Sequence, residues 1–244
     1  MIIHVYTMCY NEEILMPYFL RHYGSFADRI FVFDHYSEDS TALIVDSCPK
    51  TVRVLTGVKG IHDDRNLTNV KNEAYKNSRG KVDWVMVVDT DEFVYHPQLL
   101  DLLEEYKTKG ITLPKTTGCD MISDEIPSHS GQIYEIIKSG VFDDTFSKRA
   151  VFNPTLNICY HKGAHLCDPI GNVIESEKSE IKILHYRFLS ADFAVNRLVM
   201  RTKRLSRENI KNGWGVIPCE NGESIKESIL KSYNKRRELR ISLI

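Results

Sequence analysis

Three carboxylates follow an apolar run within four residues of the chain. The run 84–88 (WVMVV) is followed directly by Asp89, Asp91 and Glu92. Carboxylates this close repel one another, and a bound cation or a proton normally relieves the repulsion. A hard divalent ion such as Mn²⁺ or Mg²⁺ prefers oxygen ligands and leaves coordination positions open for a diphosphate. The pattern therefore predicts a metal and phosphate site, with a plain acidic turn after a strand as the alternative.

Such a site needs a further ligand from the second half of the chain, and histidines supply the candidates. His185 lies near the end of the apolar run 181–188, whereas His165 follows a glycine and an alanine. A histidine on an apolar strand is more often a core residue than a ligand, but the acidic cluster favours the ligand role. We therefore expect these metal ligands: Asp89, Asp91, and either His185 or His165.

The sheet that must position the acidic cluster is predicted by the N-terminal part of the chain. Short apolar runs alternate there with helical patterns, which is typical of βαβ units around a largely parallel sheet. We expect strands at 2–7, 30–33, 51–55 and 84–88, and helices at about 12–22, 39–48 and 67–77. Ligands of open α/β sheets gather at the carboxyl ends of the strands. The acidic cluster stands at this edge.

The second part of the chain loses this alternation. Strands are expected at 111–113, 118–122, 146–152 and 181–188, and helices at about 97–107, 191–212 and 224–240. The chain of 244 residues can bury one substantial core, and no low-complexity linker divides it. We therefore expect one α/β domain at 1–190, with halves at 1–95 and 96–190, and a helical extension at 191–244.

Composition and charge exclude several classes of protein. Hydrophobic residues make up 42% of the chain, and no apolar stretch approaches the roughly 18 residues of a membrane helix. The N-terminus carries no basic leader, so we expect a cytoplasmic protein. A net charge of −1 argues against nucleic-acid binding. The six cysteines lack metal-site spacing, which predicts reduced thiols.

The C-terminal extension is more basic than the rest of the chain. Six basic and two acidic residues stand between Asp192 and Lys211, and six more basic residues follow Asn221. A solvated helix face is the simpler interpretation. The alternatives are a surface that binds phosphates or an acidic glycan, peripheral contact with a membrane surface, and a homodimer interface.

Four motifs stand in a fixed order along the first part of the chain. They are 11–13 (NEE), 34–41 (DHYSEDST), Arg65 with 71–74 (KNEA), and 84–93 (WVMVVDTDEF). Their order resembles the donor-binding half of family 2-like GT-A glycosyltransferases, especially the branch in which an N-E-A helix leads to a W-V-x-x-x-D-x-D-E-F strand. The resemblance covers about residues 2–95, and the remainder matches only at isolated motifs such as the H-Y dipeptide at 185–186.

The resemblance implies a GT-A fold, in which helices flank a mixed, mainly parallel central sheet. It also implies metal-dependent transfer of a sugar from a nucleotide-sugar donor to a glycan, a lipid-linked molecule or a protein, with inversion favoured. The implied cofactor is Mn²⁺ or Mg²⁺. Cleavage of the bond between sugar and diphosphate develops negative charge on the leaving phosphate, which a metal and protein cations stabilise.

The resemblance also assigns donor contacts to each motif. They are Cys9, Asn11, Glu12, Asp34, Arg65, Lys71, Asn72 and Asp89. Asp34 would bind the base or ribose, and Asp89 the ribose or the donor sugar. Arg65 follows two aspartates, so a surface ion pair is an equal alternative. Lys148, from its own position before an apolar pair, is a candidate for contact with a phosphate or an acidic acceptor.

Inversion would also need a carboxylate that takes the proton of the acceptor hydroxyl. The candidates lie in or directly after the expected strand 118–122, and they are Asp120, Asp124 and Glu125. A solvated strand end is the alternative for all three.

The sequence lacks the motifs of other classes of nucleotide-binding enzymes. A nucleotidyltransferase would have a glycine-rich, basic loop after the first strand, and a dehydrogenase would have G-x-G-x-x-G. The segment 8–13 reads MCYNEE instead, and the chain has no Walker-type G-K-[ST] loop. A catalytically silent protein that binds carbohydrate or nucleotide is a further alternative, but the intact D-x-D motif favours an enzyme.

Overall fold

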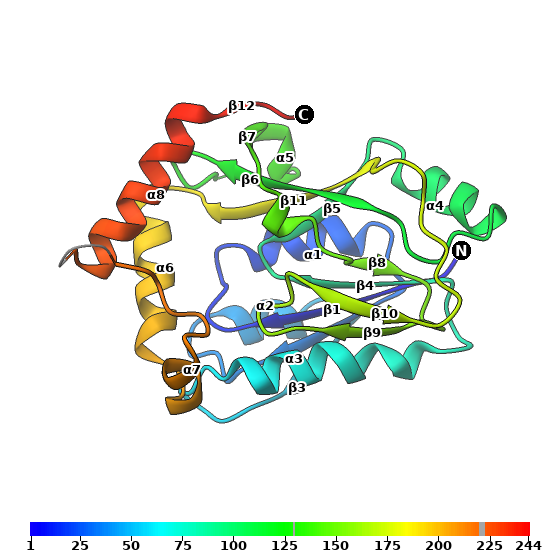
Figure 1. Cartoon of the computed structure of the whole chain (residues 1–244), viewed down its shortest axis with the longest axis horizontal. Helices are drawn as coiled ribbons and strands as arrows, with labels where there is room; N and C mark the ends of the chain where they lie inside the picture. The colour runs from blue at the N-terminus through cyan, green and yellow to red at the C-terminus, as the bar shows by residue number, and fades with distance from the viewer. Residues whose placement is uncertain (129, 220–222) are drawn as a thin grey trace.

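A mainly parallel five-stranded sheet forms the centre of the fold (Figure 1). The computed structural model describes residues 1–128, 130–219 and 223–244. The parallel strands are β1 (Ile3–Cys9), β2 (Arg29–Asp34), β3 (Thr51–Leu55) and β4 (Trp84–Asp89). The short β8 (Val151–Phe152) lies antiparallel beside β4, so the strand order is β3-β2-β1-β4-β8. The predicted mainly parallel sheet is confirmed.

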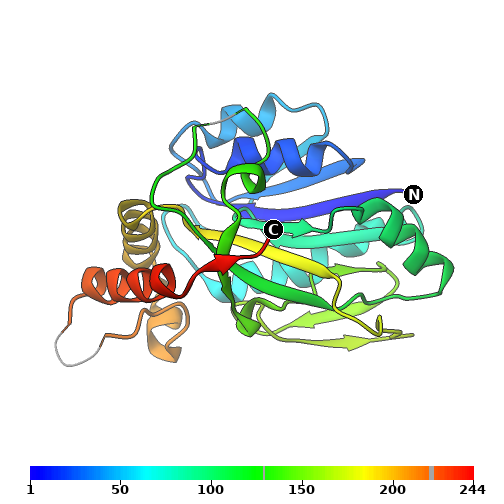
Figure 2. The ribbon, with the colours of Figure 1, turned by 90° about the horizontal axis from the view of Figure 1, so that it is seen from above.

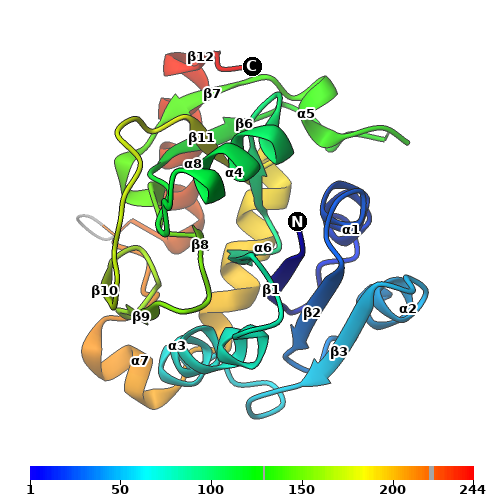
Figure 3. The ribbon, with the colours of Figure 1, turned by 90° about the vertical axis from the view of Figure 1, so that its right-hand side faces the viewer.

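Strand β4 is buried on both of its faces because helices and a second sheet cover it. These helices are α1 (Met16–Gly24), α2 (Thr41–Asp46) and α3 (Asp64–Glu73), with the 3₁₀ turn η1 (Ala74–Ser78) after α3. Trp84 and Met86 pack in the main core, whereas Val85 and Val87 pack in a second core. Helices α1 and α2 lie on one side of the sheet and α3 on the other (Figure 3). An unbroken apolar run fits a strand covered on both faces.

A second, mixed sheet is built from the later part of the chain. Its strands are β5 (Glu92–Tyr95), β6 (Thr116–Ile122), β7 (Ser139–Phe142), β11 (Ile181–Phe188) and β12 (Ile241–Ser242). The order is β12-β7-β6-β11-β5, with β11 parallel to β6 and antiparallel to β5. Strand β4 ends at Asp89 and β5 begins at Glu92. The D-x-D motif is therefore the link between the two sheets.

Smaller elements complete this part of the fold. They are α4 (Leu99–Thr108), α5 (Ile133–Ile136), the 3₁₀ turn η2 (Asp144–Phe146), and the two-stranded sheet of β9 (Asn157–Tyr160) and β10 (Cys167–Ile170). The predicted strand 146–152 is mostly irregular, since only its last two residues form β8. Residues 143–146 instead turn tightly over Gly118, where an added Cβ would lie 2.5 Å from the Asp143 carbonyl oxygen.

The C-terminal segment places three helices beside the second sheet (Figures 1 and 2). They are α6 (Ala191–Lys203), α7 (Arg207–Asn212) and α8 (Ile225–Leu239). The single helix predicted at 191–212 is broken, because Ser206 accepts a hydrogen bond from the Asn209 N–H and starts α7 anew. Helices α6 and α8 share a small core with Ile122 and Phe188. They stand at the end of the molecule where the parallel strands end.

Two further observations concern the bulk properties. None of the helices in the described part of the chain is both long and apolar enough to cross a membrane. The six cysteines are free thiols.

Candidate functional site

A cavity of about 700 Å³ opens at the carboxyl ends of β1 and β4. Side chains from both sheets, from α3 and from α6 line it, and the segment 213–218 closes one side. The acidic lining residues include Glu12, Asp89, Asp91 and Glu92, and the basic ones include Lys71, Lys148, Arg197, Arg201 and Arg204. The cavity therefore surrounds the D-x-D motif with cations from distant parts of the chain.

Asp89 is held between two lysines. Its Oδ1 accepts a hydrogen bond from Lys71 Nζ at 2.7 Å, and its Oδ2 accepts one from Lys148 Nζ at 3.2 Å. Lys148 also pairs with Glu92, whose Oε2 accepts the Asp89 backbone N–H. Burial opposes ionisation of Asp89, but the two lysines hold its pKa below the usual range. Both oxygens of Asp89 are thus engaged by cations, which fits a donor contact better than metal ligation.

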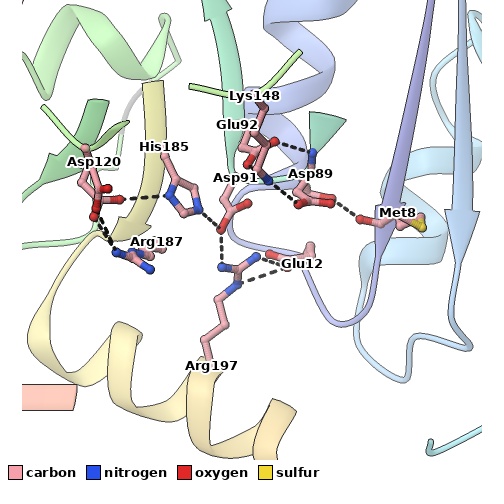
Figure 4. Close-up of polar contacts among 12 residues, drawn as sticks. Met8, Glu12, Asp89, Asp91, Glu92, Asp120, Lys148, His185, Arg187 and Arg197 are labelled. Carbon is pink, nitrogen blue, oxygen red and sulfur yellow. Dashed lines mark hydrogen bonds and ion pairs between the residues drawn. The ribbon is translucent and has the colours of Figure 1, made fainter. Parts of the chain in front are cut away.

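Asp91 faces a histidine on one side and an arginine on the other (Figure 4). Its Oδ2 lies 3.2 Å from His185 Nε2 and 2.5 Å from Arg197 Nη1. His185 Nδ1 lies 3.0 Å from Asp120 Oδ1, and the guanidinium of Arg197 also pairs with Glu12. A continuous chain of charged groups therefore runs from Asp120 through Asp91 to Glu12.

The members of this chain of charges set one another's protonation. Burial would raise the pKa of Asp91, but Arg197 and His185 hold it well below its usual range. Burial lowers the pKa of His185, yet Asp91 and Asp120 outweigh this and raise it to about 9. The two carboxylates thus favour the protonated imidazole, so His185 would have to release its Nε2 proton before it could ligate a metal. Burial raises the pKa of Glu12 to about 7, although Arg197 opposes the shift.

The pair of Asp91 and His185 fits a divalent cation. With bonds of about 2.1 Å, neighbouring ligands of an octahedral ion lie about 3 Å apart, and Asp91 Oδ2 lies 3.2 Å from His185 Nε2. A metal-bound histidine usually gives its other N–H to a carboxylate, and Asp120 is placed to accept it. Across 1–128, 130–219 and 223–244 no set of three or more such ligands converges. A cation held by Asp91 and His185 would take its other ligands from phosphate oxygens and water.

Arg201 of α6 and Arg204, which directly follows the end of α6, reach the cavity without a carboxylate partner in the described residues. Arg201 donates to the Gly215 carbonyl oxygen at 3.4 Å, and Arg204 stacks on the ring of Tyr10. The Nε atom of each is buried and lacks a hydrogen-bond partner in the same part of the chain. Burial lowers the pKa of both guanidinium groups. Because a buried cation is stabilised by an anion, these side chains indicate a site for phosphate groups.

A second cavity of about 690 Å³ adjoins the first. Glu12, Arg197 and Met200 line both cavities, so ligands in the two would meet beside these side chains. Asp124 and Glu125 line only the second cavity. The arrangement provides two neighbouring binding spaces, one rich in cations and one with carboxylates.

The structure brings most of the predicted donor and metal residues together. Those that line the first cavity are Cys9, Glu12, Lys71, Asp89, Asp91, Lys148, His165 and His185. Asn11 lines the second cavity. His165 Nδ1 donates a hydrogen bond to the Thr145 carbonyl oxygen, and the ring of Phe146 contacts both His165 and His185. Of the two rival histidines, His185 is the one in contact with Asp91.

Three predicted donor residues lie outside both cavities. Asp34 is buried and pairs with Arg53, and its other oxygen accepts the Ser37 N–H. Arg65 forms an exposed ion pair with Glu208, which was the alternative for this residue. The amide of Asn72 bonds the backbone of Tyr160, so it fastens α3 to β9. None of these three lines either of the two cavities, and their donor contacts stay predictions.

The three candidate bases are placed very differently. Asp120 is 0% exposed, and its oxygens accept from His185, Arg187 and Arg236. Burial opposes ionisation of Asp120, but these cations hold its pKa below the usual range. A carboxylate so engaged is a poor proton acceptor, and Asp120 instead orients His185. Asp124 pairs with Arg237 and Arg240, whereas Glu125 has no ion-pair partner in the described chain.

Sequence analysis missed the cations of α6 as site residues. Arg197, Arg201 and Arg204 belong to the basic segment for which binding of phosphates was one of several interpretations. Their spacing of four and three residues places them on one helix face. That periodicity was the available signal, but it does not reveal which surface the helix covers. The arginines of α8 pair mainly with aspartates within the chain.

Comparison with known proteins gives a family match that covers part of this site. The chain matches the family described as glycosyl transferase family 2 over residues 5–167, which is more than half of its length. No curated protein matches the chain. Among solved structures, S. aureus TarS is 14% identical with a TM-score of 0.42, over 97% of this chain and 43% of that chain.

Two further structures have similar scores. The S. aureus TarS fragment 1-349 in complex with UDP-GlcNAc is 14% identical with a TM-score of 0.43, over 97% of this chain and 72% of that one. Glucosyl-3-phosphoglycerate synthase from Mycobacterium tuberculosis, with Mn²⁺, UDP and glucosyl-3-phosphoglycerate, is 19% identical with a TM-score of 0.33 over 48% of this chain and 44% of that chain. The matches thus cover less than half the length of the TarS chain and of the synthase chain.

The family match covers most of β1, all of β2 to β4, the D-x-D link and Lys148, but it ends before His185 and the arginines Arg197, Arg201 and Arg204. The resemblance seen in the order of the motifs is confirmed, as is the α/β architecture that it implied. The chain belongs to glycosyl transferase family 2 and has a GT-A fold.

Proposed function

We propose that the chain transfers a sugar from a nucleoside-diphosphate sugar to an acceptor hydroxyl with the help of a divalent metal, Mn²⁺ or Mg²⁺. The observation that carries this proposal is the pairing of Asp91 with His185 inside a cavity rich in lysine and arginine. Asp91 and His185 would hold the metal. When bound, the metal would neutralise charge on the leaving diphosphate.

Side chains of the protein would bind the other parts of the donor. Arg201 and Arg204 offer guanidinium groups to the phosphates, where planar bidentate contacts favour arginine. Lys71 and Lys148 fix the ionised Asp89 at the cavity wall. We assign Asp89 to hydroxyl groups of the ribose or the donor sugar, because its oxygens face the cavity while their charge is already balanced.

The acceptor would enter through the second cavity. A glycan, a lipid-linked molecule or a protein side chain can each present a hydroxyl there, and Glu125 is the carboxylate best placed to take its proton. The support is that Glu125 lines this cavity and forms no ion pair in the described chain, whereas Asp124 is neutralised by two arginines. A base on the acceptor side fits inversion of the sugar.

Calorimetric titration with a panel of nucleotide sugars tests the proposal. UDP-, GDP- and dTDP-sugars, and their free diphosphates, are each measured with Mn²⁺, with Mg²⁺ and with a chelator. We expect one nucleotide class to bind with metal and to weaken at least about tenfold with the chelator. If the affinity for the nucleotide is the same with the chelator as with metal, the metal site is contradicted. If no nucleotide binds under any condition, the transferase assignment is contradicted.

A further inference from the structure

The side chain of Arg197 occupies the oxygen at which the proposed metal would bind. Its Nη1 lies 2.5 Å from Asp91 Oδ2, the same atom that faces His185 Nε2. On the other edge of the guanidinium, Nε lies 3.1 Å from Glu12 Oε1. Figure 4 shows the group as a bridge between the two carboxylates. Both carboxylates are buried, so each needs a cation nearby.

A metal between Asp91 and His185 would displace this guanidinium. A divalent cation shared by Asp91 Oδ2 and His185 would repel the guanidinium, whose Nη1 lies 2.5 Å from the same oxygen. The released edge of Arg197 then requires another anion, because burial with an unpaired charge is unfavourable. Arg197 lines the cavity that also holds Arg201 and Arg204, so the phosphates of a donor are the anion within its reach. Glu12 can retain the opposite edge throughout.

We propose that Arg197 is the resident counter-cation of Asp91 in the free enzyme and exchanges with the metal only when a nucleoside diphosphate arrives to accept its guanidinium. The inference rests on the proposed metal site. Metal and diphosphate then bind cooperatively. The diphosphate provides an anion for the guanidinium that the metal displaces, and the metal takes over the carboxylate that the guanidinium leaves. Couplings between two ligands of this kind are typically about 5- to 150-fold in affinity.

The test measures Mn²⁺ binding by the loss of the free-ion EPR signal, without nucleotide and with UDP, GDP or dTDP. For the wild type we expect weak binding of Mn²⁺ alone and an affinity about tenfold or more higher with the diphosphate that the protein accepts. Arg197→Gln should bind Mn²⁺ alone about tenfold more tightly than the wild type and lose most of the gain from the diphosphate. Arg201→Gln, one turn along the same helix face, should bind Mn²⁺ alone as the wild type does.

A second variant is needed as a control for misfolding, because Arg197→Gln leaves two buried carboxylates without their partner. The double variant E12Q/R197Q removes one of these charges and should show the same tighter binding of Mn²⁺ alone. If Asp91→Asn abolishes Mn²⁺ binding while neither variant binds Mn²⁺ alone more tightly than the wild type, the metal site stands and the exchange is overturned. If the wild type binds no Mn²⁺ even with a diphosphate, the metal site itself is overturned, and the exchange with it.

Discussion

His185 and Asp120 are paired directly across the second sheet. The two residues are register partners on β11 and β6, and His185 Nδ1 lies 3.0 Å from Asp120 Oδ1. Strand pairing therefore fixes the imidazole ring with its other nitrogen toward Asp91. The same carboxylate accepts from Arg187 and Arg236, so its charge is balanced by three side chains. Asp120 is thereby suited to hold His185 in one orientation and one tautomer.

Replacement of Asp120 by Asn should weaken metal binding about 10- to 100-fold. The Asn amide can donate to Nδ1, which would move the ring proton to Nε2 and remove the lone pair that the metal needs. Mn²⁺ binding in the presence of nucleotide, followed by calorimetry or EPR, measures the effect. Asp143→Asn is the matched control, because Asp143 also pairs with Arg187 and Arg236 but does not bond His185. Equal metal affinity in both variants would rule out the orienting role.

Replacement of Lys148 by Met should lower the free energy of unfolding by about 3–5 kcal/mol. Lys148 is buried, and its loss leaves Glu92, which is 1% exposed, without a cationic partner. Urea denaturation measures the change. Lys71→Met is the control, and it should cost less because Asp89 keeps its bond from Lys148 and is partly open to solvent. The prediction fails if the two variants are equally stable.

Replacement of Glu125 by Gln should reduce kcat about 10²- to 10⁴-fold, because the acceptor hydroxyl would lose its base. Donor binding should not change, since Glu125 lines only the second cavity. Steady-state rates with the donor found by titration, together with the donor Kd, separate the two effects. Asp124→Asn should leave kcat within about threefold, as its carboxylate pairs with Arg237 and Arg240. A larger effect at Asp124 than at Glu125 would reverse the assignment.

The core strands could be predicted because their pattern is local. The run 84–88 is apolar throughout and the run 181–188 is mainly apolar, and both form largely buried strands. His185 could be named for the same reason, since it stands near the end of such a strand. Two arginines show what could not be predicted from the local sequence. Arg65 stands in a family motif yet pairs on the surface, whereas Arg197 has no motif and reaches Asp91 from 106 residues away.

The difference between these arginines is a tertiary one. Whether a cation on an amphipathic helix faces solvent or a cavity depends on which surface the helix covers, and the helix sequence does not contain that information. Helix α6 covers the ends of the parallel strands because its apolar side packs on Phe188 and α8. The strand predicted at 146–152 was wrong for a similar reason, because residues 143–146 form a turn that packs against Gly118 on another strand.

The stability of the protein should fall between pH 7 and pH 4.5 in part through His22. This side chain is 4% exposed among aromatic rings, and its Nε2 bonds the Val94 carbonyl oxygen at 3.0 Å. Burial lowers the pKa of His22 to about 4, against about 6.5 in the unfolded chain. As the pH falls through 6.5, His22 therefore becomes protonated in the unfolded state but stays neutral in the folded state. The contribution is fully present above pH 6.5 and is lost by about 2–3 kcal/mol as the pH approaches 4.5.

His22→Gln isolates this contribution, because the Gln amide can donate to the same carbonyl oxygen and does not titrate. Urea denaturation of both proteins from pH 7.5 to 4.5 should show the wild type more stable at neutral pH, where the native packing of the ring is intact. The advantage of the wild type should shrink as the pH falls, since only the wild type has a buried imidazole to keep neutral. If the difference in unfolding free energy between the two proteins is the same at every pH, His22 does not carry the depressed pKa, and acid sensitivity arises elsewhere in the core.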